Sequence, residues 1–456
     1  LSTFEAIVER VREAATHRPK GTWVRGRGWD QNLWPSKRFP EHAPLSAAIP
    51  DHPVWLERVD GHASLLNALA LSTLGLDDSV KDPSGGRFLR DAEGHLSGVL
   101  VDQAQGWRPA SLEGKPDPLA ASVPELKIAI RRGAESCLSV GLTTVTDMGV
   151  DANDIEAYRE LRRAGELPIR SALFLTDDRA LLESWFARGP ELDPEARLQI
   201  RGVKMYADGA LGSRGAALVE PYSDDPANLG LLTASVDHLA EVSRRALATG
   251  FQVGIHAIGD RGNLVAIDAM ERAFGGPRPE VRFRIEHAQV MRLDDISRLA
   301  KLGIIASVQP THATSDMPWA GERVGPRRLE GAYAWRKVLD AGGSLALGSD
   351  FPVESQDPRL GLFAAITRQD VTGRPVGGWL AGERLTPQEA LRGFTLDAAR
   401  SIFLDDQIGS LTVGKRADLT VFARDPFEGA PLDLPRIDID FTYIDGKLVY
   451  RRDGAR

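Results

Sequence analysis

Four apolar segments, each carrying one polar side chain at or near its end, decide the fold: GVKMYADG (202–209), FQVGIH (251–256), VRFRIEH (281–287) and GSLALGSD (343–350). The polar residues are Lys204, His256, His287 and Asp350. Short apolar runs flanked by Gly and Asp are typical of buried parallel strands. Because active sites of parallel α/β folds form where the carboxyl ends of the strands meet, we expect these four side chains to converge.

The same pattern continues along the middle of the chain. Three more apolar runs are LTTVTD (142–147), IRSALFL (169–175) and GIIASVQ (303–309). Helical patterns separate the runs at 151–164, 178–188, 236–249, 262–274, 292–302 and 328–340. This alternation predicts an α/β protein with a parallel sheet and helices outside it. An eight-stranded (β/α)8 TIM barrel needs one strand more than these seven, so we expect strand 1 to be missing before residue 1.

The two ends of the chain differ from the middle. Residues 1–123 look irregular, with a helix at 4–16, a Trp/Gly/Pro-rich stretch and a hairpin-like segment at 87–101. We expect them to form a large insertion subdomain after strand 1. Residues 124–400 form the predicted catalytic barrel, which a capped helix at 387–400 ends. Residues 401–456 are expected to form a small β-sandwich appendage with a hairpin at Asp445-Gly446.

Composition excludes several classes of protein. Lys and Arg number 56 against 64 Asp and Glu, and 42% of residues are hydrophobic, as in an ordinary globular protein. No Lys/Arg-rich block points to nucleic acid, no long apolar run points to a membrane, and Cys137 alone cannot form an internal disulfide. We expect a small-molecule substrate and a cytoplasmic location, with a homodimer as one option for assembly.

The converging side chains favour a metal site. Taken singly, each has an ordinary interpretation: a strand-end His is often hydrogen-bonded structure, a Lys extends to the surface, and an Asp after Gly-Ser forms a turn. Two imidazoles, a carboxylate and a lysine in the order Lys204, His256, His287 and Asp350 suit one or two divalent metal ions. Zinc accepts nitrogen and oxygen ligands of these kinds, and other divalent metals remain alternatives.

The chain resembles the amidohydrolase superfamily of metal-dependent hydrolases, and within it the YtcJ-like branch, amidohydrolase family 3, which includes N-substituted formamide deformylase. The segments that carry the resemblance span nearly the whole chain: GWDQNLWP (28–35), RVDGHASLLNALAL (58–71), GLTTVTDMG (141–149), KMYADGALGSRGAAL (204–218), HAIGDRGN (256–263), RIEHAQ (284–289), SVQPTHATSDMPWA (307–320), ALGSDFPVES (346–355) and IGSLTVGKRADLTVF (408–422).

The resemblance implies a role for each of the four residues. His256 and His287 match the family's metal ligands on strands five and six. Lys204 matches a strand-four lysine that is carboxylated in binuclear members, which turns an ammonium that cannot bind metal into a bridging carboxylate. Asp350 matches the strand-eight aspartate, a metal-site residue and the expected catalytic group that takes a proton from water and delivers it to the leaving amine.

One departure from the family pattern concerns strand one. The superfamily has a His-x-His pair at the end of that strand, and no His-x-His occurs in this sequence. We expect the pair and its strand to lie upstream of Leu1. The chain alone would then have an open barrel, half a metal site and little metal binding or activity.

Further residues are expected to contact substrate. His62 follows an apolar run, and Trp29 and Asp30 lie in a Gly-rich loop. Arg214 could bind a substrate carboxylate or carbonyl, and His312 follows strand seven. Each has a structural alternative: core packing for His62 and Trp29, and a surface ion pair for Arg214. Glu286 is expected to face away from His287 and to be structural.

The leading hypothesis is a metal-dependent amidohydrolase that uses activated water to cleave a C–N bond, of amide or N-formyl type but not a peptide bond, in a small molecule. One alternative is a metal-assisted isomerase or lyase on the same barrel. Another is a non-catalytic small-molecule binder with an incomplete metal site.

Overall fold

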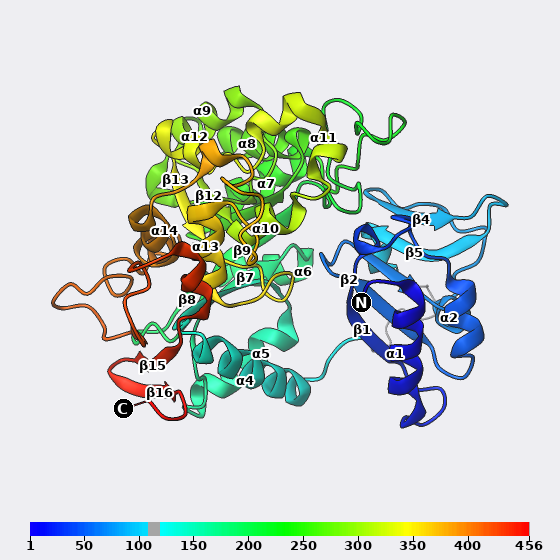
Figure 1. Ribbon diagram of the computed structural model, residues 1–456, viewed down its shortest axis with the longest axis horizontal. Coiled ribbons are helices and arrows are strands. Elements are labelled where there is room, and N and C mark those ends of the chain that lie inside the picture. Colours follow the sequence, from blue (N-terminus) through cyan, green and yellow to red (C-terminus); the bar gives the residue numbers. More distant parts are fainter. Residues whose placement is uncertain (108–118, 456) are drawn as a thin grey trace. The chain divides into compact units, whose positions relative to one another are not determined.

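A curled parallel sheet of seven strands organises the larger part of the molecule (Figure 1). Its strands follow one another in space in the order of the sequence: β6 (Thr144–Val150), β7 (Arg170–Thr176), β9 (Leu198–Tyr206), β10 (Gln252–Ala257), β11 (Arg284–His287), β12 (Ile305–Val308) and β13 (Ser344–Leu347). A two-residue strand, β8 (Glu191–Leu192), pairs antiparallel with β9. All seven predicted strands are confirmed.

The computed structural model describes residues 1–107 and 119–455, which fall into two compact units. Unit 1 comprises Leu1–Ala120 and Asp208–Ala234, and unit 2 comprises Ala121–Ala207 and Ser235–Arg456. The parallel sheet belongs to unit 2. Across the described residues no pairing joins β13 to β6, so the sheet is TIM-barrel-like but open.

Helices follow the strands of unit 2 as the sequence predicts. The confirmed ones are α5 (Ala152–Arg163), α6 (Arg179–Arg188), α7 (Val236–Thr249), α8 (Asp260–Phe274) and α9 (Leu293–Leu302). Further helices of this unit are α4 (Val123–Ser139), α10 (Pro310–Asp316) and α13 (Pro358–Thr367), with short helical turns η4 (Pro279–Val281) and η6 (Ala381–Glu383).

Two predicted helices are interrupted in the structure. The helix expected at 328–340 is replaced by α11 (Ala320–Arg328), η5 (Leu329–Gly331) and α12 (Trp335–Asp340). Tyr333 has a φ of +49°, which a continuous right-handed helix does not allow. The helix expected at 387–400 divides at Thr395 into α14 (Pro387–Phe394) and α15 (Leu396–Arg400).

Unit 1 is more regular than its sequence suggests. Five strands form a mixed sheet in the order β1 (Val24–Trp29), β2 (Val54–Arg58), β3 (Ala63–Leu66), β5 (Leu96–Asp102) and β4 (Gly86–Arg90). Only β1 and β2 are parallel. Helices α1 (Phe4–Thr16), α2 (His42–Ala48) and α3 (Ala68–Thr73) accompany the sheet, with turns η1 (Gln31–Leu33) and η2 (Gln103–Gly106). The predicted helix 4–16 and the hairpin at 87–101 are confirmed.

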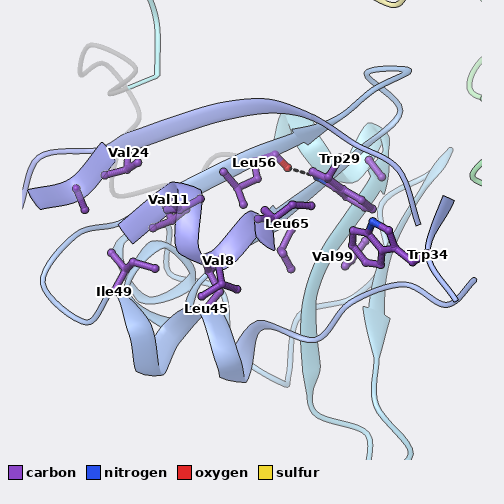
Figure 2. Packing of buried hydrophobic residues seen from close by; sticks show 14 of the residues in the cluster. Val8, Val11, Val24, Trp29, Trp34, Leu45, Ile49, Leu56, Leu65 and Val99 are labelled. Atoms are coloured by element: carbon purple, nitrogen blue, oxygen red, sulfur yellow. Dashed lines mark hydrogen bonds between the residues drawn. The ribbon is translucent and has the colours of Figure 1, made fainter. Parts of the chain in front are cut away.

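The core of unit 1 lies between α1, α2 and the sheet (Figure 2). Val8 and Val11 repeat along one face of α1 and pack with Leu45, Leu56 and other buried side chains of the same cluster. Burying such side chains stabilises a fold by about 2 kcal/mol each. This packing explains how a segment in which strands and helices do not alternate regularly still forms a compact unit.

The C-terminal residues form a single three-stranded antiparallel sheet where we had expected a sandwich. Its order is β14 (Leu419–Phe422), β15 (Ile439–Ile444) and β16 (Lys447–Arg451), after the turn η7 (Pro431–Arg436). The predicted hairpin is confirmed: Asp445 and Gly446 both have positive φ, as a tight two-residue turn requires. Two layers are needed for a sandwich, and the described residues supply one here.

Among the described residues, no helix is both long enough and apolar enough to span a bilayer.

The packing beneath β9 gives a stability test. A Cβ built at Gly202 would overlap the ring of Phe174, which is fully buried, so Gly202→Ala should lower the free energy of unfolding by about 1–3 kcal/mol. Gly133 lies inside α4 with open space around it, and Gly133→Ala should stabilise the protein by up to about 1 kcal/mol. Urea denaturation measures both. Equal stability of the two variants would contradict this packing.

Candidate active site

The four predicted residues lie at the carboxyl ends of unit 2 strands. Lys204 lies two residues before the end of β9, His256 is the second-to-last residue of β10, and His287 is the last residue of β11. Asp350 lies three residues beyond the end of β13. All belong to the same unit, as the strand-end pattern predicts.

The strand register places Lys204, His256 and the residues paired with them on one face of the sheet. Lys204 pairs with Gly254, which pairs with Arg284; two residues further on, Tyr206 pairs with His256, which pairs with Glu286. Paired residues of parallel strands point the same way, and so do residues two apart. Lys204, Tyr206, His256, Arg284 and Glu286 therefore share a face.

Gly254 lies between Lys204 and Arg284, the residues with which it pairs on the two neighbouring strands. A Cβ at Gly254 would lie 2.8 Å from Oε1 of Glu286 and 3.0 Å from Cε of Met148. Glycine is thus the residue that leaves room for the long side chains on each side.

Glu286 is part of this polar face. Its Oε1 accepts a hydrogen bond of 2.8 Å from Nε of Arg284, and both side chains are buried. Arg284 also lies over the ring of Phe174 at 4.7 Å. Glu286 does alternate with His287, as expected, but it shares the face of Lys204 and His256. Its charge therefore acts within the candidate site.

His287 joins this group because its backbone leaves the extended region. The φ angles of His287 and Ala288 are +76° and +42°. A left-handed conformation is uncommon for residues other than Gly and reorients the side chain relative to the pleat. The ring of His287 lies 4.6 Å from that of His256, centroid to centroid, at an interplanar angle of 69°. The two imidazoles thus meet although they occupy alternate positions on neighbouring strands.

Two residues after β12 contact His287. Nδ1 of His287 lies 2.9 Å from Oε1 of Gln309, in a buried hydrogen bond. The ring of His312, on α10, stacks on that of His287 with centroids 5.8 Å apart. The structure therefore places His312 beside the two histidines. Gln309 was not singled out in the sequence, since a glutamine at a strand end carries no signal of its own.

Lys204 lies in a buried, charged environment. Its side chain is 4% exposed, and its Nζ lies 4.7 Å from the centre of the Tyr206 ring. Burial lowers the pKa of the Lys204 ammonium, and the charge of Arg284 acts in the same direction. The carboxylates of Glu286 and Asp350 act in the opposite direction, without outweighing burial.

Tyr206 is a member of the site that the sequence did not reveal. Its ring lies 5.2 Å from the His256 ring, and a Cβ at Gly149 would lie 3.9 Å from its hydroxyl. Burial, together with the charges of Asp350 and Glu286, raises the pKa of the Tyr206 hydroxyl to about 12. The hydroxyl is therefore protonated in neutral solution and can donate a hydrogen bond.

Asp350 is the most accessible of the four. Its residue is exposed, and its φ of +57° is left-handed, in the turn that follows β13. Its charge acts on both Lys204 and Tyr206. An accessible carboxylate whose charge acts on a buried lysine and a tyrosine is suited to carry protons to and from solvent.

The residues present fit part of a metal site. The imidazoles of His256 and His287 are adjacent and each offers ring nitrogens to a metal ion. The hydrogen bond between His287 and the amide oxygen of Gln309 resembles the support that metal-ligating histidines receive. Within residues 1–107 and 119–455, no three His, Cys, Asp or Glu side chains lie close enough together to hold a metal ion. Two imidazoles are thus the part of the ligand set that is already assembled.

Trp29 and Asp30 have structural partners in unit 1. Trp29 is 4% exposed in the hydrophobic core, and its Nε1 donates to the Leu56 carbonyl at 2.8 Å (Figure 2). Asp30 caps η1 and accepts a hydrogen bond of 2.6 Å from buried Arg58. These contacts agree with the core-packing alternative for Trp29 and give Asp30 a partner within unit 1; a place for either residue in the wall of a pocket stays a prediction.

His62 forms a dyad with an aspartate that the sequence did not reveal. Its Nδ1 lies 2.8 Å from Oδ1 of Asp102, and the two side chains are 16% and 1% exposed. Asp102 has a φ of +49° and a ψ of −121° at the end of β5, a strained backbone for a residue other than Gly. A Cβ at Gly209 or Gly215 would overlap its carboxylate.

The Gly-rich segment after β9 therefore packs within unit 1. Gly212 adds a third close approach, because a Cβ there would lie 3.0 Å from Nη2 of Arg58. In the same segment Arg214 donates to Asp224 at 2.9 Å. Arg214 is thus held in an ion pair, one of the two alternatives that the sequence left open.

The strand order and the strand-end residues define an α/β fold of the metal-dependent hydrolase type. A family model described as "Amidohydrolase family" matches residues 1–450, and the chain belongs to this family. The YtcJ-like resemblance is confirmed over the whole chain: the Bacillus subtilis protein YtcJ is 31% identical over 99% of this chain and 84% of its own length.

An N-substituted formamide deformylase from Arthrobacter pascens is 28% identical over 100% of this chain and 84% of its own length. Among solved structures, an uncharacterized metal-dependent hydrolase from Pyrococcus horikoshii has a TM-score of 0.72 at 29% identity, over 94% of this chain and 82% of that one. A second, from Pyrococcus furiosus, has a TM-score of 0.67 at 31% identity, over 91% and 80%. These structural neighbours are thus metal-dependent hydrolases.

The His62–Asp102 dyad predicts a pH-dependent contribution to stability. Burial of the His62 ring opposes protonation, but the hydrogen bond and charge of Asp102, with the charges of Asp60 and Asp208, raise its pKa above 6.5. A raised pKa stabilises the folded state fully below the unfolded value, and this contribution is lost as pH rises through the folded value.

We therefore expect His62→Gln to lower the free energy of unfolding more at about pH 5.5 than at about pH 8.5, by on the order of 1–2 kcal/mol. His95→Gln is the matched control, since His95 also bonds an aspartate through Nδ1, at 2.7 Å, but in an exposed pair. Its effect should be smaller. A His62 effect that is constant across this pH range would contradict the assignment.

Proposed function

We propose that this protein is a metal-dependent amidohydrolase that cleaves the C–N bond of an amide or N-formyl group in a small molecule. The observation that carries the proposal is the meeting of the His256 and His287 rings, 4.6 Å apart, at the carboxyl ends of parallel strands, with buried Lys204 on the same face of the sheet as His256. Imidazoles are among the ligands that catalytic metal ions use, and the carboxyl ends of parallel strands are where such sites form. Membership of the amidohydrolase family supports the reaction class.

His256 and His287 would hold the cation through ring nitrogens. When bound there, a divalent metal ion, which we propose to be zinc, polarises a carbonyl group and lowers the pKa of a water molecule. Lys204 would add an oxygen ligand after carboxylation of its amine. The lowered pKa of Lys204 is consistent with this, because the neutral amine is the form that adds carbon dioxide.

The remaining residues of the face supply proton transfer and orientation. Asp350 would take a proton from the attacking water and give it to the leaving nitrogen, so that the amine departs neutral. Tyr206, protonated in neutral solution, would donate a hydrogen bond to the substrate. His312, stacked on His287, would contact the substrate beside it. Lys204 and both histidines are buried, whereas Tyr206 is 37% exposed and Asp350 is exposed, so substrate and solvent would reach the buried residues from the side of Tyr206 and Asp350.

The proposed substrate class rests on relatives as well as chemistry. The Arthrobacter pascens relative is an N-substituted formamide deformylase. N-substituted formamides are therefore the compounds to test first, with simple amides of the same amines as the second set.

Metal dependence tests the proposal. The protein loaded with zinc should release amine from an N-substituted formamide, and a chelator followed by zinc should abolish and restore that release. His256→Asn should lower zinc affinity by at least about tenfold, because it removes one of the adjacent imidazoles. The control is His238→Asn, on an exposed histidine paired with Asp177. Turnover that survives chelation and His256→Asn would rule out the metal-dependent reaction.

Asp350→Asn tests the proton-transfer role. The amide keeps the size of the side chain but cannot accept the proton, so we expect kcat to fall by about 10²–10⁴-fold. The free energy of unfolding should change by less than about 0.5 kcal/mol, since the residue is exposed. Rates and urea denaturation are measured on the same preparation. A folded variant with the wild-type rate would assign proton transfer to another group.

A further inference from the structure

A line of two hydrogen bonds connects the ring of His287 to the backbone of β12. Nδ1 of His287 lies 2.9 Å from Oε1 of Gln309, and Nε2 of Gln309 lies 3.4 Å from the carbonyl oxygen of Ser307. The His287 and Gln309 side chains are both buried, at 8% and 7% exposure. Gln309 is the N-cap of α10 and precedes Pro310, whose fixed φ restricts the backbone there.

The backbone end of this line fixes the direction of both bonds. A carbonyl oxygen only accepts, so the amide nitrogen of Gln309 must face Ser307 and its amide oxygen must face His287. That amide oxygen also only accepts, so Nδ1 of His287 must carry the hydrogen. In the neutral ring Nε2 then holds the lone pair, which is the electron pair a metal ion needs.

The ring contacts of His287 with His256 and His312 do not select a nitrogen. The backbone of His287 is left-handed, so the alternation of side chains along β11 does not determine the direction of its ring. The His312 ring stacks on it at an interplanar angle of 17°, and the His256 ring approaches at 69°. These ring contacts fix the plane of the imidazole. A flip of the ring within that plane exchanges its nitrogen and carbon positions but leaves the ring contacts similar. The bond to Gln309 distinguishes the two orientations.

We propose that Gln309 is a positioning residue that holds His287 in the Nδ1–H tautomer and presents Nε2 to the cation. The tautomer follows from the hydrogen bonds alone. The presentation to a cation rests on the proposed function, so the two parts need separate measurements.

The tautomer is measured on metal-free protein labelled with ¹⁵N-histidine, at about pH 8, from long-range ¹H–¹⁵N spectra. The His287 signals are assigned by their loss in His287→Asn. We expect a protonated Nδ1 and an unprotonated Nε2 in the wild type. Gln309→Leu removes the acceptor and should give a mixture of tautomers, whereas Gln309→Glu keeps an accepting oxygen and should restore the single form. A wild-type ring with its hydrogen on Nε2 overturns the inference.

Gln289→Leu is the matched control. Gln289 is also buried, lies two residues from His287, and donates to Asp316 and Tyr333 at 3.1 and 2.9 Å. Its loss should perturb folding as much as Gln309→Leu while leaving the His287 tautomer unchanged. If Gln289→Leu mixes the tautomers to the same extent, general destabilisation explains the effect and the inference is overturned.

Zinc affinity of the same proteins tests the second part. We expect Gln309→Leu to weaken zinc binding by about 10–100-fold, with Gln309→Glu and Gln289→Leu close to the wild type. If Gln309→Leu mixes the tautomers and no protein binds zinc, the proposed function fails and the positioning of His287 stands. If zinc binds the wild type and Gln309→Leu equally well, the positioning role toward the cation is wrong.

Discussion

The parallel register of β9, β10 and β11 is the constraint on which the rest of the site depends. It aligns Lys204 with Gly254 and Arg284, and Tyr206 with His256 and Glu286, on one face. A slip of one residue in any of these strands would turn its polar side chains into the helix-covered side of the sheet. Because the strands are buried, such a slip would place charged side chains among aliphatic ones, which is energetically unfavourable. The apolar residues that alternate with the polar ones along each strand therefore fix which face is polar.

Charge balance is the second requirement of this face. A buried guanidinium and a buried ammonium lie at the same level of neighbouring strands, with Gly254 between them. Glu286 pairs directly with Arg284, and its charge, with that of Asp350, also acts on Lys204. Conversion of Lys204 to a carbamate would replace its positive charge with a negative one. The Arg284 guanidinium, which already pairs with the Glu286 carboxylate, would then compensate the added negative charge.

Much of the fold was predictable, because each buried strand is a short apolar run and helices separate the runs. The positions of Lys204, His256 and His287 at strand ends were predictable for the same reason, because each follows or lies within such an apolar run; their role in a metal site stays a prediction. The left-handed turn at His287 was not predictable, since nothing in RIEH distinguishes it from an ordinary strand end. Asp102 and Gln309 were missed because their partners are distant in sequence. Trp29 lies in the core of unit 1, which is the packing alternative that the sequence left open for it.

The central claim is that the His256 and His287 imidazoles jointly hold a divalent cation. The most direct test is anomalous diffraction at the zinc edge from crystals of the protein grown with zinc. The account predicts a peak at about 2.1 Å from Nε2 of His287 and from a ring nitrogen of His256. A peak elsewhere on the molecule, with none between these two rings, would contradict it.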